Sequence, residues 1–183
     1  EVVMAAPLMP QLELAASLLG SIAAEHRHVI VTAESLTGGL VAAAITSVAG
    51  SSAWFDRGFV TYATPSKTEL LDVDPAVIER EGVVSEAVAR AMARGSLARS
   101  RATMSVALTG VAGPTGGPSK TPVGTVCIGW GELTPDGDIV TVARTIHVPG
   151  SRETVRLAAG IVALQGLMAY MGGTNPRLMP CEY

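Results

Sequence analysis

Residues 29–39 read Val29-Ile30-Val31-Thr32-Ala33-Glu34-Ser35-Leu36-Thr37-Gly38-Gly39, an apolar run that ends in hydroxyl groups and glycines where a helical pattern begins. This order is typical of the carboxyl end of a strand in an α/β protein, where such folds place their sites. The next helix has unpaired backbone N–H groups at its start, and these can stabilise an anion or a developing oxyanion. The segment therefore predicts a strand, a turn and a helix, with a candidate site at Ser35.

A second segment repeats this pattern. Residues 105–117 read Ser105-Val106-Ala107-Leu108-Thr109-Gly110-Val111-Ala112-Gly113-Pro114-Thr115-Gly116-Gly117. Taken alone, the Ser and Thr residues of 29–39 could act only as helix caps, and Gly38-Gly39 could only let a turn adopt positive φ. The recurrence favours a functional interpretation, because two such loops can face one pocket.

Length and composition indicate one α/β domain. The chain has 183 residues, 48% of them hydrophobic and only 4% aromatic, so its core must consist mainly of Ala, Val, Leu and Ile. The formal net charge of −3 argues against a broad basic surface for nucleic acid. We interpret four arginines as a solvated helix face and expect no nucleic-acid partner: Arg90, Arg94, Arg99 and Arg101.

The cysteines and histidines predict neither a disulfide nor a metal site. Cys127 lies in an apolar run and Cys181 near the end of the chain, a pattern that fits a reducing cytoplasm. His26, His28 and His147 make no recognisable metal-ligand spacing. No uninterrupted apolar stretch reaches the roughly 18 to 20 residues that span a bilayer. We therefore expect a soluble cytoplasmic protein with no bound metal and no membrane partner.

Hydrophobic periodicity and flanking Gly and Pro residues predict the order of elements. The predicted strands are 29–34, 58–63, 105–109, 123–130 and 139–148, and the predicted helices are 11–26, 39–46, 85–99 and 151–170. Between the last two strands, Pro135-Asp136-Gly137-Asp138 supplies a hairpin turn. The prediction is a single α/β domain, a mixed β-sheet sandwiched between helices, over 11–173. A loose leader (1–10) and a poorly ordered tail (174–183) are expected to flank it.

Several known motifs are absent from the sequence. The glycine-rich loops lack the Gly-Lys-Ser or Gly-Lys-Thr of a phosphate-binding P-loop, and no Gly-x-Gly-x-x-Gly follows the first strand. Ser35 lies in neither Gly-x-Ser-x-Gly nor Ser-x-x-Lys. A nucleophile at Ser35 would therefore need a base from elsewhere in the chain.

Lys67 is the best candidate for that base, with Tyr62 beside it. Tyr62 is expected to end a strand and Lys67 to start a short helical segment, so both could lie at the sheet edge that displays Ser35. The alternative is that Lys67 is a solvated charge and Tyr62 a packing residue. A neutral Lys amine requires burial or a nearby cation to lower its pKa.

Six motifs occur in the same order as in the CinA C-terminal domain family, and the chain resembles that family over most of its length. They are Glu34-Ser35-Leu36-Thr37-Gly38-Gly39, Gly50-Ser51-Ser52-Ala53-Trp54-Phe55, Gly58-Phe59-Val60-Thr61-Tyr62, Gly82-Val83-Val84-Ser85, Thr109-Gly110-Val111-Ala112-Gly113-Pro114 and Pro122-Val123-Gly124-Thr125-Val126. Pro149-Gly150-Ser151-Arg152 is similar to a later loop of the family.

The resemblance implies deamidation of nicotinamide mononucleotide to nicotinic acid mononucleotide and ammonia. It implies Ser35 as the nucleophile, with Lys67 and Tyr62 in proton transfer. Backbone N–H groups near 37–39 or 109–110 would stabilise the oxyanion, and the 110–117 loop with Arg152 would hold the ribose phosphate. The substrate-binding residues implied in this way are Thr37, Gly38, Gly39, Ser52, Thr109, Gly110, Gly113 and Arg152. No metal or organic cofactor is needed for this mechanism.

Two positions depart from the family's usual residues. Leu36 stands where the family usually has Cys, and Thr64 stands where it usually has Asn, in Thr64-Pro65-Ser66-Lys67. A hydroxyl has one donor where an amide has two, so the change at 64 bears more on activity than the change at 36.

Three functions remain open from the sequence. The first is the amidohydrolase. The second is a non-catalytic nucleotide-binding or regulatory module of the same fold, for which the departures at 36 and 64 argue. The third is a structural subunit whose small-residue helices serve self-association. The high apolar content predicts a homo-oligomer and is compatible with either a dimer or a trimer.

Overall fold

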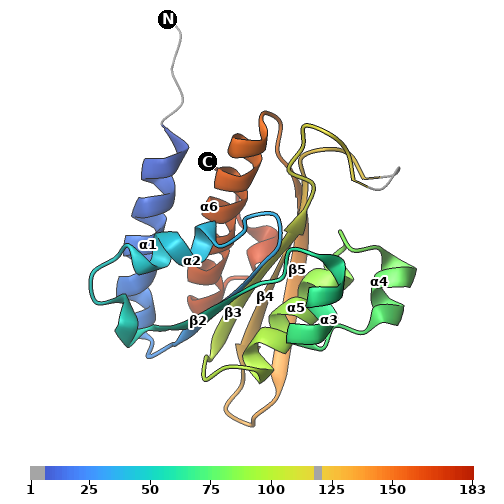
Figure 1. Cartoon of the computed structure of the whole chain (residues 1–183). Coiled ribbons are helices and arrows are strands. Elements are labelled where there is room, and N and C mark those ends of the chain that lie inside the picture. Colours follow the sequence, from blue (N-terminus) through green and yellow to red (C-terminus); the bar gives the residue numbers. More distant parts are fainter. Residues whose placement is uncertain (1–6, 118–120) are drawn as a thin grey trace, which may run out of the picture.

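The apolar, β-branched segments of the sequence form a mixed sheet. In the computed structural model, which describes residues 7–117 and 121–183, the sheet has five strands in the order β2-β1-β3-β4-β5 (Figure 1). The strands are β1 (Ile30–Glu34), β2 (Phe55–Val60), β3 (Met104–Gly110), β4 (Thr125–Leu133) and β5 (Ile139–His147). β1 pairs in parallel with β2 and β3, whereas the β3–β4 and β4–β5 pairs are antiparallel.

Helices cover both faces of this sheet. One face packs against α1 (Leu8–Glu25), α2 (Leu40–Thr46) and α6 (Arg152–Met171), and the other against α5 (Glu86–Ala98) (Figure 1). Helices α3 (Thr64–Leu71) and α4 (Pro75–Glu81) lie on this second side and contact α5. Two short 3-10 turns are η1 (Ser51–Ala53) and η2 (Pro176–Leu178). The predicted α/β fold, a mixed sheet sandwiched between helices, is confirmed.

The central strand β3 is mostly apolar because it is covered on both faces. Met104, Val106 and Leu108 pack in the cluster under α1 and α6, while Ala107 packs in the cluster under α5. Successive side chains of a strand point to opposite faces, so a strand covered on both sides is apolar at most positions. The site described below lies at the carboxyl ends of β3 and of its neighbour β1, all five residues of which are buried.

Close helix–sheet packing depends on small residues, most sharply at Gly166 of α6. A Cβ at this position would collide with the indole of Trp130, a buried β4 side chain whose Nε1–H donates to Ala163 O at 3.0 Å. We expect Gly166→Ala to lower the free energy of unfolding by about 1–3 kcal/mol, measured by denaturant titration, because overpacking forces backbone shifts. The matched control is Gly172→Ala, where a Cβ meets only atoms at 3.5 Å and beyond. If the two variants unfolded at the same denaturant concentration, this account would be contradicted.

Among the described residues, helix α6 is the one that is long and apolar enough to span a membrane. Sixty-seven per cent of that apolar window is buried inside the protein. Its apolar residues contact α1 and the sheet, as expected of the core helix of an α/β domain.

Several predicted boundaries were wrong. Helix α1 starts at Leu8 rather than residue 11, so 8–10 are helical, while residues 1–6 of the expected leader lie outside the described residues. Strand β2 runs from 55 to 60 rather than 58 to 63. Gly58 was taken to mark a strand start, but it lies inside β2, where a Cβ would be 2.7 Å from Thr32 Oγ1. A glycine at position 58 leaves room for the Thr32 side chain of the neighbouring strand β1.

Two further features differ from the sequence analysis. Helix α4 was not predicted, although Asp74 caps it by accepting from the Ala76 N–H at 2.9 Å and Pro75 follows at its first position. The segment after α6, expected to be poorly ordered, forms η2 and is tied to the domain by the guanidinium groups of Arg177, which donates to Ala143 O, and of Arg144. Arg144 donates to Pro176 O and Met179 O at 2.9 and 3.0 Å.

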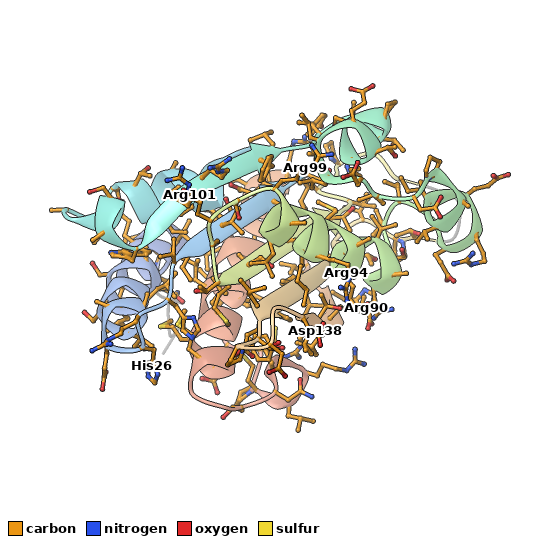
Figure 2. The ribbon with its side chains drawn as sticks, turned by 90° about the horizontal axis from the view of Figure 1, so that it is seen from below. His26, Arg90, Arg94, Arg99, Arg101 and Asp138 are labelled. Carbon is orange, nitrogen blue, oxygen red and sulfur yellow. The ribbon has the colours of Figure 1, made fainter. Side chains whose placement is uncertain are left out.

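The arginines interpreted as a solvated helix face have partners within the chain. Arg99 pairs with Asp72 at 2.6 Å, Arg90 lies 3.9 Å from Glu86, and Arg94 donates to Ile139 O. Figure 2, seen from below, labels these arginines: Arg90 and Arg94 lie on α5, and Arg99 and Arg101 follow its end.

Candidate active site

Ser35 is placed by the carboxyl end of β1. It directly follows the last residue of that strand, and its N–H donates to Leu108 O at 3.0 Å, which continues the pairing with β3. Because β1, β2 and β3 are parallel, the chain leaving each of them meets at the same edge of the sheet. Thr61 and Tyr62 after β2, and Thr109 and Gly110 at the end of β3, therefore gather around Ser35.

Lys67 is brought to this edge by α3. The helix begins at Thr64, directly after β2, and turns the lysine side chain back toward Ser35. Lys67 is only 1% exposed, and its Nζ lies 3.0 Å from Ser35 Oγ. Burial lowers the pKa of Lys67 from 10.5 to about 8. At that pKa about a tenth of the amine is neutral at pH 7, which is the form that can accept a proton.

Two backbone carbonyls fix the direction of the amine. Lys67 Nζ donates to Thr61 O at 2.6 Å and lies 3.5 Å from Tyr62 O. A neutral amine has two hydrogens and one lone pair. With its hydrogens on these two carbonyl oxygens, the lone pair faces the hydroxyl of Ser35, as a general base for that hydroxyl requires.

Ser35 and Lys67 open into a cavity of about 240 Å³. Its lining residues come from five segments that are far apart in the sequence: Ser35, Leu36, Tyr62, Thr64, Lys67, Val83, Val84, Thr109, Gly110, Ala112 and Arg152. The cationic groups in this lining are Lys67 and Arg152. In the part of the chain that the structure describes, no group of three or more His, Cys, Asp or Glu residues could hold a metal ion.

Arg152 lies at the mouth of this cavity. It is the first residue of α6 and donates to Gly113 O at 2.7 Å and to Tyr62 Oη at 3.2 Å, so it connects the loops after β2 and β3. The Tyr62 phenol is largely exposed and contacts Arg152, whereas the Tyr62 backbone carbonyl is the part that faces Lys67. Tyr62 therefore lies at the site, with its hydroxyl at the mouth rather than beside the amine.

The remaining predicted residues are placed differently. Thr109 lines the cavity, but its hydroxyl donates to Val83 O at 2.9 Å. Gly38 and Gly39 form the turn into α2 with φ of +57° and +101° and do not line the cavity. Ser52 lies in η1, which precedes β2, at the opposite edge of the sheet. The structure does not bring Ser52 to this cavity.

The sequence analysis missed Arg156, Val83 and Val84. Arg156 donates to Leu36 O at 3.0 Å and to Thr37 O at 3.1 Å, which holds the turn after Ser35 against α6. It lies four residues after Arg152, on the same face of one helix, and this spacing was visible in the sequence. The two valines form part of the cavity wall, and they belong to a motif that was recognised but given no role.

Comparison with known proteins now places the chain in a family. The model of the CinA C-terminal domain matches residues 12–171. The chain belongs to the CinA C-terminal domain family. Thr64, where the sequence resemblance led us to expect Asn, lies at the first turn of α3 and in the cavity lining. Leu36 also contributes to the lining, but it is 5% exposed and packs in the main apolar cluster.

Relatives within the family carry two kinds of name. A protein of Enterobacter agglomerans named nicotinamide-nucleotide amidohydrolase PncC is 48% identical over 136 residues, 74% of this chain and 80% of that protein. A CinA-like protein of Chlorobaculum tepidum is 46% identical over 144 residues, 79% of this chain. This chain spans only about a third of that relative's length, 34%.

A solved structure shares the fold. The competence/damage inducible protein CihA from Agrobacterium tumefaciens superposes with a TM-score of 0.79 at 39% sequence identity. The match covers 87% of this chain and 94% of that one.

Proposed function

We propose that this CinA-family domain hydrolyses the carboxamide of nicotinamide mononucleotide to give nicotinic acid mononucleotide and ammonia. The observation that carries the proposal is the 3.0 Å approach of a buried, pKa-lowered amine, Lys67, to the hydroxyl of Ser35 inside a cavity. The relative named as a nicotinamide-nucleotide amidohydrolase, 48% identical to this chain, supports the choice of substrate.

The proposed reaction has two halves. Ser35 Oγ attacks the carboxamide carbon while neutral Lys67 takes the hydroxyl proton, and a tetrahedral intermediate forms. The C–N bond then breaks, and Lys67 returns the proton to the departing nitrogen, which leaves as ammonia. Water, deprotonated by Lys67, attacks the resulting ester, and its collapse releases the carboxylate product and restores the Ser35 hydroxyl.

The N–H of Leu36 is our candidate for the main oxyanion donor. In the turn after the nucleophile, Gly38 N–H donates to Ser35 O and Leu40 N–H donates to Thr37 O, so these two groups are already used. Leu36 directly follows Ser35 and lines the cavity. A backbone N–H fixed beside the nucleophile stabilises the developing charge without reorganisation.

The test of this function is direct. Purified protein is incubated with nicotinamide mononucleotide, and ammonia and the acid product are quantified together. We expect the two products in equal amounts. Failure of the wild-type protein to release either product would overturn the proposed function.

Arg152 is proposed to bind the ribose phosphate, because a guanidinium at the cavity mouth has donors beyond the two used on Gly113 O and Tyr62 Oη. We expect Arg152→Ala to raise KM by about 10- to 100-fold, the loss of a charge-assisted contact of about 1.5–3 kcal/mol, with little change in kcat. Initial-rate kinetics check this, with the exposed Arg101→Ala as control. An unchanged KM would remove the phosphate assignment.

We also propose that the domain self-associates, as the apolar composition predicts. Leu14 and Leu18 on α1 are exposed and lie next to a groove that α6 residues Ile161 and Met168 help to line. Light scattering after size-exclusion chromatography measures the molar mass, and a monomer at micromolar concentration would refute self-association.

A further inference from the structure

Glu34 is a buried carboxylate that the proposed reaction does not use. It is the last residue of β1, immediately before Ser35, and its side chain is fully buried. A buried carboxylate is costly unless its oxygens receive hydrogen bonds. Here Oε1 accepts from the Val41 N–H at 2.9 Å and Oε2 from the Ala42 N–H at 3.0 Å. Both donors belong to the first turn of α2.

These contacts tie the two ends of the nucleophile turn together. The main chain of Glu34 is held by the sheet, since its carbonyl accepts from the Thr61 N–H at 2.8 Å. Its side chain is held by the Val41 and Ala42 N–H groups of α2. Residues 35–40, between Glu34 and these two donors, form a short turn in which Gly38 N–H also donates to Ser35 O at 3.0 Å. The position of Ser35 Oγ relative to Lys67 thus depends on one bidentate carboxylate.

We propose that Glu34 is a positioning residue for Ser35: by accepting both first-turn N–H groups of α2, its carboxylate fixes the turn so that Ser35 Oγ stays within hydrogen-bonding distance of Lys67. The inference rests on the proposed function in so far as Ser35 is the nucleophile. A carboxylate is required because two parallel N–H donors need two acceptor oxygens. An amide supplies one oxygen and directs an NH₂ group at the second donor.

The positioning role of Glu34 can be separated from an effect of its negative charge on the pKa of Lys67. The Glu34 oxygens accept from the Val41 and Ala42 N–H groups, Lys67 Nζ has Ser35 Oγ and two carbonyls as its partners, and burial is the cause of the lowered pKa of Lys67. Removing the carboxylate should therefore reduce the rate without moving the pH at which activity rises. A small displacement of an attacking atom can cost about 100-fold in rate.

The experiment compares Glu34→Gln with the wild type, using Glu25→Gln as the matched control because Glu25 is an exposed carboxylate at the end of α1. Two rates are measured where circular dichroism shows all proteins folded. One is turnover of nicotinamide mononucleotide, and the other is sulfonylation of Ser35 by phenylmethylsulfonyl fluoride, which forms a sulfonate ester at Ser35 Oγ with loss of fluoride and is followed by mass spectrometry. We expect Glu34→Gln to lower kcat at least 10-fold with KM within about 3-fold, and to slow sulfonylation in parallel. The control should match the wild type.

A second variant approaches the same contact from the other side. Ala42→Pro removes one of the two N–H donors within the first turn of α2, where proline is tolerated, and leaves Glu34 intact. It should lower both rates, but less than Glu34→Gln does, and it keeps the proposal testable if Glu34→Gln fails to fold.

The outcomes distinguish this inference from the proposed function. If the folded variants are sulfonylated and turn over substrate at rates within twofold of the wild type, the positioning role is refuted. If the wild type is sulfonylated at Ser35 and Glu34→Gln slows sulfonylation, but no deamidation occurs, the positioning role holds and the proposed substrate is wrong. If the wild-type Ser35 reacts with neither reagent, both proposals are refuted.

Discussion

Replacing Ser35 by Ala is expected to reduce deamidation of nicotinamide mononucleotide by at least about 10⁴-fold. The hydroxyl oxygen is the group that would form the acyl bond, and no neighbouring side chain can substitute for it at the same place. Stability should change little, because Ser35 Oγ makes one side-chain hydrogen bond, to Lys67. Release of ammonia and of nicotinic acid mononucleotide measures the loss, and thermal unfolding measures the stability.

The matched control is Ser17→Ala, which removes an exposed hydroxyl from α1, distant from the cavity. Calorimetry with the Ser35→Ala protein separates binding from chemistry: we expect the mononucleotide still to bind. If Ser35→Ala keeps more than about one hundredth of the wild-type rate, another group is the nucleophile and the proposed mechanism is wrong.

Lys67→Met is expected to lower kcat/KM by about 10²- to 10⁴-fold, the usual loss when a general base is removed. In the wild type the neutral amine is the active form, and the pKa of Lys67 is lowered to about 8 by burial. Activity should therefore rise with pH and level off above about pH 8. A pH profile of kcat/KM checks this, and a rate that is independent of pH from 6 to 9 would exclude Lys67 as the base.

The same burial makes stability depend on pH. Between about pH 8 and 10.5 the unfolded chain holds the Lys67 proton and the folded chain does not, so the free energy of unfolding rises with pH across this window. Below pH 8 Lys67 is protonated in both the folded and the unfolded chain, so the folded protein bears the full cost of burying its charge. The lowering of the Lys67 pKa from 10.5 to about 8 corresponds to a rise of about 3 kcal/mol in the free energy of unfolding across the window. We expect this rise, measured by denaturant titration, to be absent in Lys67→Met and retained in Ser35→Ala.

A rise of the same size in Lys67→Met would show that other groups produce it. In that case the amine is not desolvated in the folded protein, and its selection as the base would lose its physical reason.

The main parts of the fold and of the site were predictable from the sequence. An apolar run followed by Ser35, Thr37 and two glycines predicted the end of a strand, and β1 ends at Glu34. The hairpin expected between 123 and 148 is β4 and β5, closed by a turn at Gly137. These features depend on neighbours within a few residues, so periodicity and turn chemistry are sufficient.

Other parts of the site could not be read in this way. Lys67 was selected as a candidate base and its resemblance to a family residue added support, but nothing local in 64–67 distinguishes a buried lysine from a solvated one. Its burial follows from α3 folding back over the sheet edge. Glu34 was quoted as part of a motif and given no role, because its partners are two backbone groups that appear only when α2 is in place.

The sequence by itself determined most of the strands and helices, the family, and the position of Ser35 at a strand end, because these depend on local pattern and short motifs. Only the tertiary structure decided which groups meet. The parallel pairing of β1 with β2 puts Lys67, which follows β2, beside Ser35, and puts Ser52, which precedes β2, at the far edge. Strand order and direction are set by burial of the whole sheet between two helical layers, and no short segment contains that information.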